Sequence, residues 1–264
     1  MMKLATMRKH MRGKVKRYLH TPIYIFQMGK VGSKSLKATL SAKYRGAIVH
    51  AHSYKGMSFS ERALLTWRKR LYLPIYVICP IREPLSRNVS AFFQTFKRDT
   101  GFDFTEQEWT SSELKDLFLK YYPHKVCNEW FDKHFRTTFD LDIFSKPFPI
   151  ERKWNVYKHR SIKVLIFRAD LERDEQLRAV SEFIDCKIDN WTFANVSEEK
   201  EYSKLHKNFC RSVTLPDIYI SLMCKSRFCQ HFWSLEEIVA FSSHWKGKRG
   251  NARDEDPAAF HPLQ

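Results

Sequence analysis

No stretch of the 264-residue sequence is apolar enough to cross a membrane. The longest apolar run, residues 73–81, is far shorter than the roughly 20 residues of a membrane-spanning helix. The first 20 residues are basic and lack the apolar segment of a secretory signal. We therefore expect a cytoplasmic protein without a transmembrane segment. Peripheral contact with a membrane, through this basic arm, stays open as an alternative.

Cysteine is scarce and badly spaced for metal binding. None of the six cysteines forms a Cys-x-x-Cys pair, and no histidine lies at zinc-finger spacing from them. Structural zinc sites use such pairs, so no metal site is expected. The cysteines are predicted to be reduced thiols, mostly buried, as is usual in the cytosol.

Acidic residues are outnumbered by basic ones. Lys and Arg number 46 against 29 Asp and Glu, which gives a formal net charge of +17. Such an excess favours anionic partners, namely phosphates, sulfates, acidic glycans or nucleic acid. The basic residues are scattered and form no recognised nucleic-acid motif, so no nucleic-acid partner is expected. A non-catalytic protein that binds nucleic acid or other polyanions remains an alternative.

Short apolar runs alternate with helical segments along the chain. Strands are predicted at residues 22–26, 47–50, 75–79 and 163–167, and helices at 33–43, 60–70, 84–97, 112–122, 126–135 and 171–183. Residues 197–246 are expected to be helical, with Pro216 as an interruption. This alternation predicts an α/β fold, a single domain with a central parallel sheet flanked by helices. We place this domain at residues 21–250, between a basic arm (1–20) and a tail (251–264).

Glycine is rare, with eight residues in the chain, yet two of them follow the first predicted strand. Such a strand, turn and helix can bind phosphate through backbone amides and the helix dipole. Seven consecutive residues make up this turn: Gly29, Lys30, Val31, Gly32, Ser33, Lys34 and Ser35. Its lysines add charge and its serines add hydroxyl donors. The alternative is an ordinary strand–helix turn with surface lysines.

The loop departs from the pattern of nucleotide triphosphatases. That pattern is Gly-x-x-x-x-Gly-Lys-[Ser/Thr]. Here Ser33 precedes Lys34, and Met28 stands where the first glycine is needed. The third predicted strand leads to Arg82 instead of an aspartate. Magnesium-dependent hydrolysis is therefore disfavoured, although a small-molecule kinase with a degenerate loop stays as an alternative.

The loop resembles the 5′-phosphosulfate loop of sulfotransferases that use 3′-phosphoadenosine 5′-phosphosulfate (PAPS). The pattern in that family is Lys-x-Gly-[Ser/Thr]-x-[Ser/Thr], which residues 30–35 match. The resemblance implies a P-loop-like sulfotransferase fold, PAPS as co-substrate without a metal, and Lys30 as the catalytic lysine. The seven loop residues would bind PAPS.

A second segment supports the same resemblance. The family places an arginine for the 3′-phosphate at this strand end and a serine eight residues later, which correspond to Arg82 and Ser90. Residues 168–171 resemble a further family segment, with Ala169 in place of its usual Glu. Residues 128–132 resemble the Asn-Lys-Trp-Tyr-Ser signature of the capsular-polysaccharide-synthesis-type branch, with Lys, Tyr and Ser replaced.

Sulfuryl transfer to a hydroxyl needs a base. His50 and His52 follow the second predicted strand, at the edge where the loop also emerges, and histidine titrates near neutral pH. We favour His52, keep His50, and expect that only one of the two faces the site because side chains alternate along a strand. Glu83 and Glu129 are further candidates. The acceptor group is expected to be a hydroxyl or an amine. The resemblance to the capsular-polysaccharide-synthesis-type branch implies that the acceptor is a carbohydrate. The sequence predicts neither which carbohydrate this is nor the oligomeric state.

Overall fold

The computed structural model describes residues 20–192 and 202–247. The predicted tail, and the basic arm except His20, lie outside these residues, so both stay predictions. The chain divides into two compact units: one comprises residues 1–82 and 130–195, the other 83–129 and 196–264. The expected α/β class with a central, mostly parallel sheet is confirmed. Across the described ranges, no helix combines the length and apolarity that membrane crossing requires.

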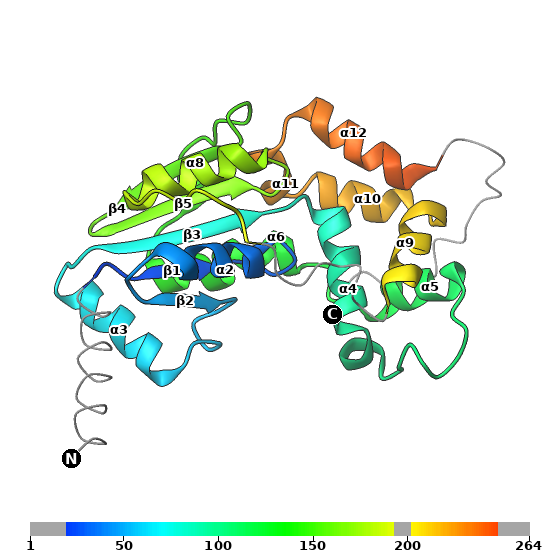
Figure 1. Cartoon of the computed structure of the whole chain (residues 1–264). Coiled ribbons are helices and arrows are strands. Elements are labelled where there is room, and N and C mark those ends of the chain that lie inside the picture. The colour runs from blue at the N-terminus through cyan, green and yellow to red at the C-terminus, as the bar shows by residue number, and fades with distance from the viewer. Residues whose placement is uncertain (1–19, 193–201, 248–264) are drawn as a thin grey trace, which may run out of the picture. The chain divides into compact units, whose positions relative to one another are not determined.

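The first unit holds a five-stranded sheet (Figure 1). Its strands are β1 (Ile23–Phe26), β2 (Ile48–Ala51), β3 (Ile75–Ile81), β4 (Trp154–His159) and β5 (Ile162–Arg168). They lie in the order β2-β1-β3-β5-β4, and all neighbours are parallel except the pair β4–β5. The carboxyl ends of β1, β2 and β3 therefore meet at one edge of the sheet.

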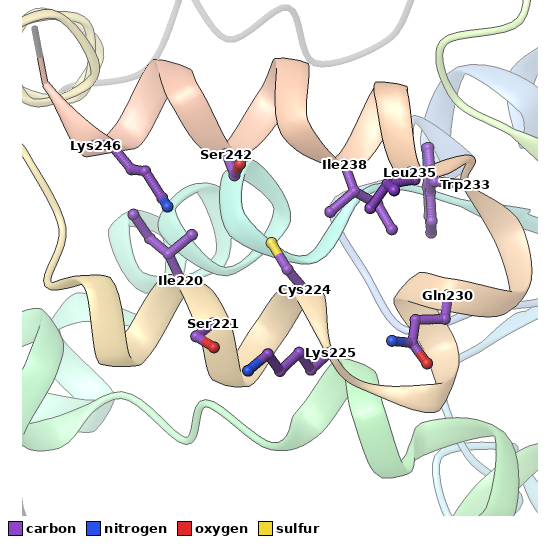
Figure 2. Close-up of a pocket in the computed structure, with 10 residues that line it drawn as sticks. All are labelled: Ile220, Ser221, Cys224, Lys225, Gln230, Trp233, Leu235, Ile238, Ser242 and Lys246. Atoms are coloured by element: carbon purple, nitrogen blue, oxygen red, sulfur yellow. The ribbon is translucent and has the colours of Figure 1, made fainter.

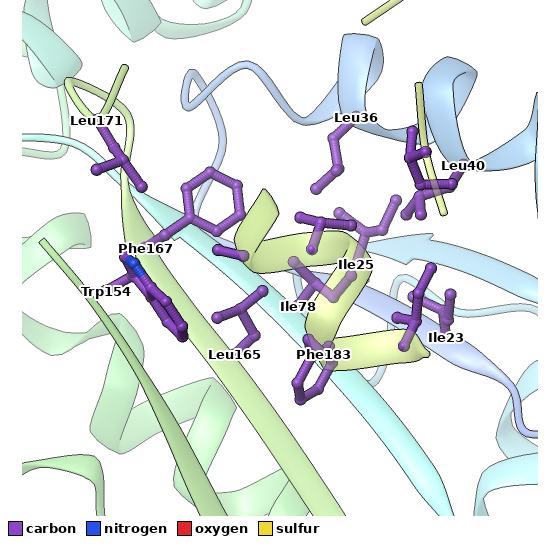
Figure 3. Close-up of a cluster of buried hydrophobic side chains, with 14 residues drawn as sticks. Ile23, Ile25, Leu36, Leu40, Ile78, Trp154, Leu165, Phe167, Leu171 and Phe183 are labelled. Carbon is purple, nitrogen blue, oxygen red and sulfur yellow. The ribbon is translucent and has the colours of Figure 1, made fainter. Parts of the chain in front are cut away.

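Both faces of β1 are buried, which explains its continuous apolar sequence. On one face, Ile23 and Ile25 pack with side chains of α2 (Ser33–Lys43) and α8 (Arg173–Ile184) (Figure 3). On the other face, Phe26 contacts Phe139 edge-on, with ring centroids 5.1 Å apart. The sheet is thus the middle layer between helices, which fixes where its strand ends lie.

Two features of the chain differ from the predicted elements. β4 was not predicted, because its apolar residues do not form a continuous run; it pairs with β5 through a two-residue turn at Arg160, whose φ is 52°. The predicted helix 126–135 is α6 (Val126–Trp130) followed by a π-helix, η1 (Phe131–Arg136), and then α7 (Thr137–Phe139). The wider turns of a π-helix are frequent at functional sites.

The first unit also contains α3 (Phe59–Arg70), which begins with a capping box between Ser58 and Glu61. A short 3-10 helix, η2 (Ile143–Ser145), precedes β4. Arg68 of α3 is buried and donates to the carbonyl oxygens of Pro74 and His20. These bonds fasten α3 to the segments that lead into β3 and β1.

The second unit is helical in the residues described. Its elements are α4 (Pro84–Thr100), α5 (Ser111–Tyr121), most of α6, α9 (Ser203–Ser212), α10 (Asp217–Cys224), α11 (Arg227–Phe232) and α12 (Leu235–Lys246). Aromatic rings fill its interior, and Phe92 of α4 contacts both Phe96 and Phe118 at 5.4 Å between centroids. Phe92, Phe93 and Tyr122 are therefore core residues, whereas Phe102 and Tyr121 are exposed.

Candidate functional site

The loop between β1 and α2 has an unusual backbone. Gly29, Lys30 and Gly32 have positive φ values of 89°, 64° and 78°. Two glycines adopt this conformation without strain, whereas Lys30 holds it despite its side chain. Strained non-glycine residues of this kind cluster at functional sites. The sequence predicted the glycine-based turn, but not the left-handed conformation of Lys30.

The loop leads into a helix terminus suited to an anion. Gly32 is the N-cap of α2 and has no side chain to cap the helix, and no acidic residue lies in the first turn. The helix dipole places partial positive charge there. Lys34 is exposed and Ser35 half-buried, whereas Val31 and Ser33 are only 4% and 6% exposed. The loop thus has lysine side chains at its exposed edge, while Val31 and Ser33 anchor it in the interior of the protein.

Gln27 connects this loop to the strand beside it. Its side chain is fully buried, and its Oε1 accepts a hydrogen bond from the amide of Gly29. Its Nε2 lies 3.2 Å from His50 Nε2 and 3.0 Å from His52 Nδ1. Because the Gly29 amide is a donor, Oε1 must face it, which fixes the orientation of the amide group. The sequence predicted no separate role for Gln27.

Both histidines contact Gln27, so the expected alternation of their side chains does not apply. β2 ends at Ala51, and His52 lies beyond the strand, where alternation is no longer imposed. The two rings are 5.6 Å apart between centroids. His50 is half-buried and His52 is exposed.

The environment of His52 defines its tautomer. Its Nδ1 lies 2.8 Å from the backbone oxygen of Gln27, and a carbonyl oxygen can only accept a hydrogen bond. Gln27 Nε2, a donor, lies slightly farther from the same nitrogen, at 3.0 Å. On the shorter contact we assign the proton of the neutral ring to Nδ1, which leaves the lone pair on Nε2 and makes Gln27 Nε2 a neighbour of Nδ1 without a hydrogen bond to it. Trp130 holds the same residue from the other side, because its indole Nε1 donates to the backbone oxygen of His52 at 2.7 Å. Trp130 thus holds the backbone of His52, and the contact of Nδ1 with the Gln27 oxygen orients the exposed imidazole.

His50 has a different environment. Burial lowers the pKa of His50 from 6.5 to about 4, with further contributions from His52, Lys37 and Lys34. It is therefore neutral at neutral pH. Its Nε2 lies 2.9 Å from the hydroxyl oxygen of Ser33, the first residue of α2. His50 thus supports the predicted phosphate loop directly.

Arg82 follows β3 and is partly exposed. β1 lies between β2 and β3, with Ile25 opposite both His50 and Ile78. The carboxyl ends of these three parallel strands lie at one edge of the sheet, which is where open α/β sheets bind ligands. The loop after β1, His52 after β2 and Arg82 after β3 all belong to this edge of the first unit.

The remaining predicted residues belong to the second unit. Glu83 is the N-cap of α4, and its carboxylate accepts hydrogen bonds from the amides of Leu85 and Ser86, each at 2.8 Å. This role in capping explains the acidic residue without a catalytic function. Ser90 lies in α4 and is 9% exposed, and Glu129 lies in α6. A joint phosphate site of Arg82 and Ser90 stays a prediction.

The segment at residues 168–171 forms a charge pair. Arg168 is 2% exposed and contacts both oxygens of Asp170, at 3.0 and 2.6 Å. Asp170 also accepts from Lys153 at 3.1 Å. These cations outweigh the opposing effect of burial and lower the pKa of Asp170. Residues 168–171, where the sequence resembles a family segment, thus contain a bidentate ion pair at the end of β5.

The sequence predicted no separate role for two residues of this site, Gln27 and Trp130. A polar residue directly after a buried strand was a usable signal for Gln27, and the signature-like segment included Trp130. Among residues 20–192 and 202–247, no group of three or more His, Cys, Asp or Glu side chains could hold a metal ion.

No known protein-family model, curated protein or solved structure matches this chain.

Proposed function

We propose that the protein is a PAPS-dependent sulfotransferase, with its donor site at the carboxyl edge of β1, β2 and β3. The observation that carries this proposal is the loop after β1. Three of its residues have positive φ, and it ends at a helix terminus with neither a side-chain cap nor an acidic first turn. This arrangement suits an anion of the phosphate or sulfate type.

The choice of PAPS over other phosphates rests on the resemblance and on Arg82. Residues 30–35 fit the 5′-phosphosulfate pattern, and the pattern of triphosphatases is not met. Arg82, at the end of the neighbouring strand β3, offers a guanidinium that suits a second phosphate. In the proposal, Ser90 supplies the hydroxyl of that second site. The amide of Gly29 is used by Gln27, so the anion-binding amides would come from the start of α2.

The proposed chemistry assigns one role to each polar group. Lys30 stabilises the charge that builds on the bridging oxygen as the adenosine bisphosphate leaves. His52 accepts the proton of the acceptor hydroxyl through Nε2, since Nδ1 donates to the backbone of Gln27. His50 is neutral at physiological pH and positions Ser33. The acceptor is proposed to be a carbohydrate hydroxyl.

Ligand-induced thermal stabilisation tests the donor site. A ligand that binds only the folded state raises the melting temperature, and at equal concentration the tighter ligand raises it more. We expect adenosine 3′,5′-bisphosphate to stabilise the protein more than AMP at equal concentration, because AMP lacks the 3′-phosphate. Arg82→Ala should reduce the bisphosphate effect to that of AMP. Lys158→Ala, an exposed lysine on β4, is the matched control.

The same titration can contradict the proposal. Equal stabilisation by AMP and the bisphosphate would show that the protein has no site for the second phosphate. Stabilisation by ATP with magnesium that exceeds the bisphosphate effect, together with phosphorylation of an acceptor, would favour a kinase. Binding of polyanions that falls steeply with salt and ignores the bisphosphate would favour a non-catalytic polyanion-binding protein.

A further inference from the structure

A second candidate site lies within the helical unit, between α10 and α12. Figure 2 shows this pocket, which has a volume of about 520 Å³. Pockets of about 300–1,000 Å³ are typical of small-molecule sites. Three successive helices and the turn between α11 and α12 supply its lining: Ile220, Ser221, Cys224, Lys225, Gln230, Trp233, Leu235, Ile238, Ser242 and Lys246.

The lining has an apolar part and a cationic part. Ile238, Leu235 and Trp233 lie to one side of Cys224, and Lys246 lies to the other (Figure 2). Among the ten lining residues two are lysines and none is acidic. Lys246 pairs with Asp217 at 3.7 Å, but both side chains are at least half exposed, so this pair is weak.

Apolar side chains are exposed at this pocket to an uncommon degree. Leu235, in its lining, is 76% exposed, and Val239, one turn further along α12, is 55% exposed. Contiguous exposed apolar surface is a feature of ligand-binding grooves and interaction sites. A ligand that covered Leu235 would remove apolar area from water, which is favourable.

A thiol marks the middle of the pocket. Cys224 is half-buried, and its Sγ points into the space between α10 and α12 (Figure 2). The buried thiol of Cys229 donates a hydrogen bond to it, which lowers the pKa of Cys224, and Lys246 contributes in the same direction. Cys224 is therefore a reactive reporter within the site.

We propose that this pocket binds a single-chain amphipathic carboxylate, with its head group beside Lys246 and its chain along Ile238, Leu235 and Trp233. The separation of cation and apolar wall within one pocket selects a ligand that is anionic at one end and apolar at the other. This site does not depend on the proposed sulfotransferase activity.

Protection of Cys224 from alkylation tests the site on the full chain. Decanoate is the probe, iodoacetamide the reagent, and peptide mass spectrometry the measurement. We expect decanoate below its micellar concentration to slow the labelling of Cys224 at least about fivefold, because the bound chain covers the thiol. Cys186 and Cys210 are also half-buried but lie outside the pocket, so their labelling should not change.

Two matched pairs of variants separate the head-group contact from the chain contact. Lys246→Glu should weaken decanoate protection about tenfold, since a partly screened attraction becomes a repulsion. Lys158→Glu carries the same charge change outside the pocket and should have no effect. Ile238→Ala should weaken protection about fivefold through lost apolar contact. Ile218→Ala makes the same change at an exposed position of α10 outside the lining and should leave protection unchanged.

Several outcomes would overturn the proposal. Absence of protection would do so, as would equal protection by decyltrimethylammonium, because the lysine would then play no part. Equal protection of all three thiols would indicate a detergent effect. If vesicles of anionic phospholipid protect Cys224 where monomeric decanoate does not, the surface docks on membranes. Protection that rises with protein concentration alone would assign the pocket to a second copy of the chain.

Discussion

Gln27 links the phosphate loop to the two candidate bases. One amide group contacts the backbone of Gly29, the ring of His50 and the ring of His52. A buried amide with this many partners fixes its neighbours, because each unmet hydrogen bond would cost about 1–3 kcal/mol. The position of both histidines therefore depends on a residue that carries no charge itself.

Replacement of Gln27 by glutamate should change the protonation of His50. In the native chain, Gln27 Nε2 lies 3.2 Å from His50 Nε2. Gln27→Glu keeps an oxygen for the Gly29 amide and replaces this nitrogen by a negatively charged carboxylate oxygen. An adjacent carboxylate favours imidazolium, so the pKa of His50 should rise above its value of about 4. NMR titration of the histidine ring protons measures this change.

Gln27→Met is the control for that titration. It removes the hydrogen bonds of residue 27 to Gly29 and to the ring of His50 without adding charge, so the pKa of His50 should stay well below 6.5. An equal pKa in the glutamate and methionine variants would show that residue 27 does not contact the His50 ring in solution.

Lys30 is the residue on which the proposed activity depends most. We expect Lys30→Ala to reduce sulfuryl transfer from PAPS at least about 100-fold, by analogy with the loss of other groups that stabilise transition-state charge. Lys30→Arg should retain part of the activity because it retains the charge. Transfer of labelled sulfate to an acceptor is the measurement, and unchanged turnover in Lys30→Ala would remove the residue from its role.

The tautomer of His52 separates its two ring nitrogens by function. Nδ1 donates to the Gln27 backbone, and Nε2 stays available as a base. His52→Ala should therefore lower turnover about 100-fold or more with little change in the affinity for adenosine 3′,5′-bisphosphate. Titration calorimetry and a transfer assay on the same variant separate these effects. Full activity would assign the base to another residue.

At the scale of elements, the central strands and the helix after the loop followed closely from the sequence. α2 spans the predicted residues 33–43, and β1 begins only one residue later than predicted. The strand could be predicted because apolar β-branched runs identify buried parallel strands. β4 was missed since an edge strand carries polar residues such as Lys158, which suit solvent exposure. Its turn at Arg160 also lacks the usual glycine or asparagine.

The candidate site was predictable only in part, for a related reason. A motif places Lys30 and Ser33 on one loop, whereas contacts such as Ser33 to His50 depend on the register of two strands. The bond from Trp130 to His52 joins segments 78 residues apart in sequence. Register and long-range pairing come from tertiary packing, which no local pattern contains.

The N-terminus of α4 offers a test that distinguishes capping from catalysis. Glu83→Ala should lower the free energy of unfolding by about 1 kcal/mol, since two amides lose their acceptor. Glu83→Asp should keep both stability and activity. Chemical denaturation measures the first effect. Loss of turnover in Glu83→Asp at unchanged stability would restore Glu83 as a candidate base.

At the scale of the whole molecule, each compact unit contains a histidine that folding keeps neutral. His50 belongs to the first unit and His124 to the second. Burial lowers the pKa of His124 from 6.5 to about 4, and its ring packs 4.8 Å from those of Phe118 and Tyr219. Each unit therefore contains a histidine that stays neutral in the folded chain between pH 6.5 and about 4.

This shared property predicts how stability depends on pH. Between pH 6.5 and about 4 the unfolded chain binds a proton at each of these histidines and the folded chain does not, so the free energy of unfolding falls as the pH is lowered. For His124, which is 3% exposed, the contribution reaches about 3 kcal/mol at pH 4. The carboxylate of Asp170, whose pKa is lowered, adds the same trend only below about pH 4.

Urea denaturation at pH 4.5, 5.5 and 6.5 measures this dependence. His124→Phe removes the titrating ring but keeps an aromatic side chain among Phe118, Tyr122 and Tyr219. The variant should lose less stability between pH 6.5 and 4.5 than the native chain. Val89→Ala, at a buried apolar position of α4 in the same unit, is the control: it removes no titrating group and should keep the native slope. Identical slopes for the native chain and His124→Phe would show that His124 titrates normally in the folded protein, because only a lowered pKa links its protonation to unfolding in this range.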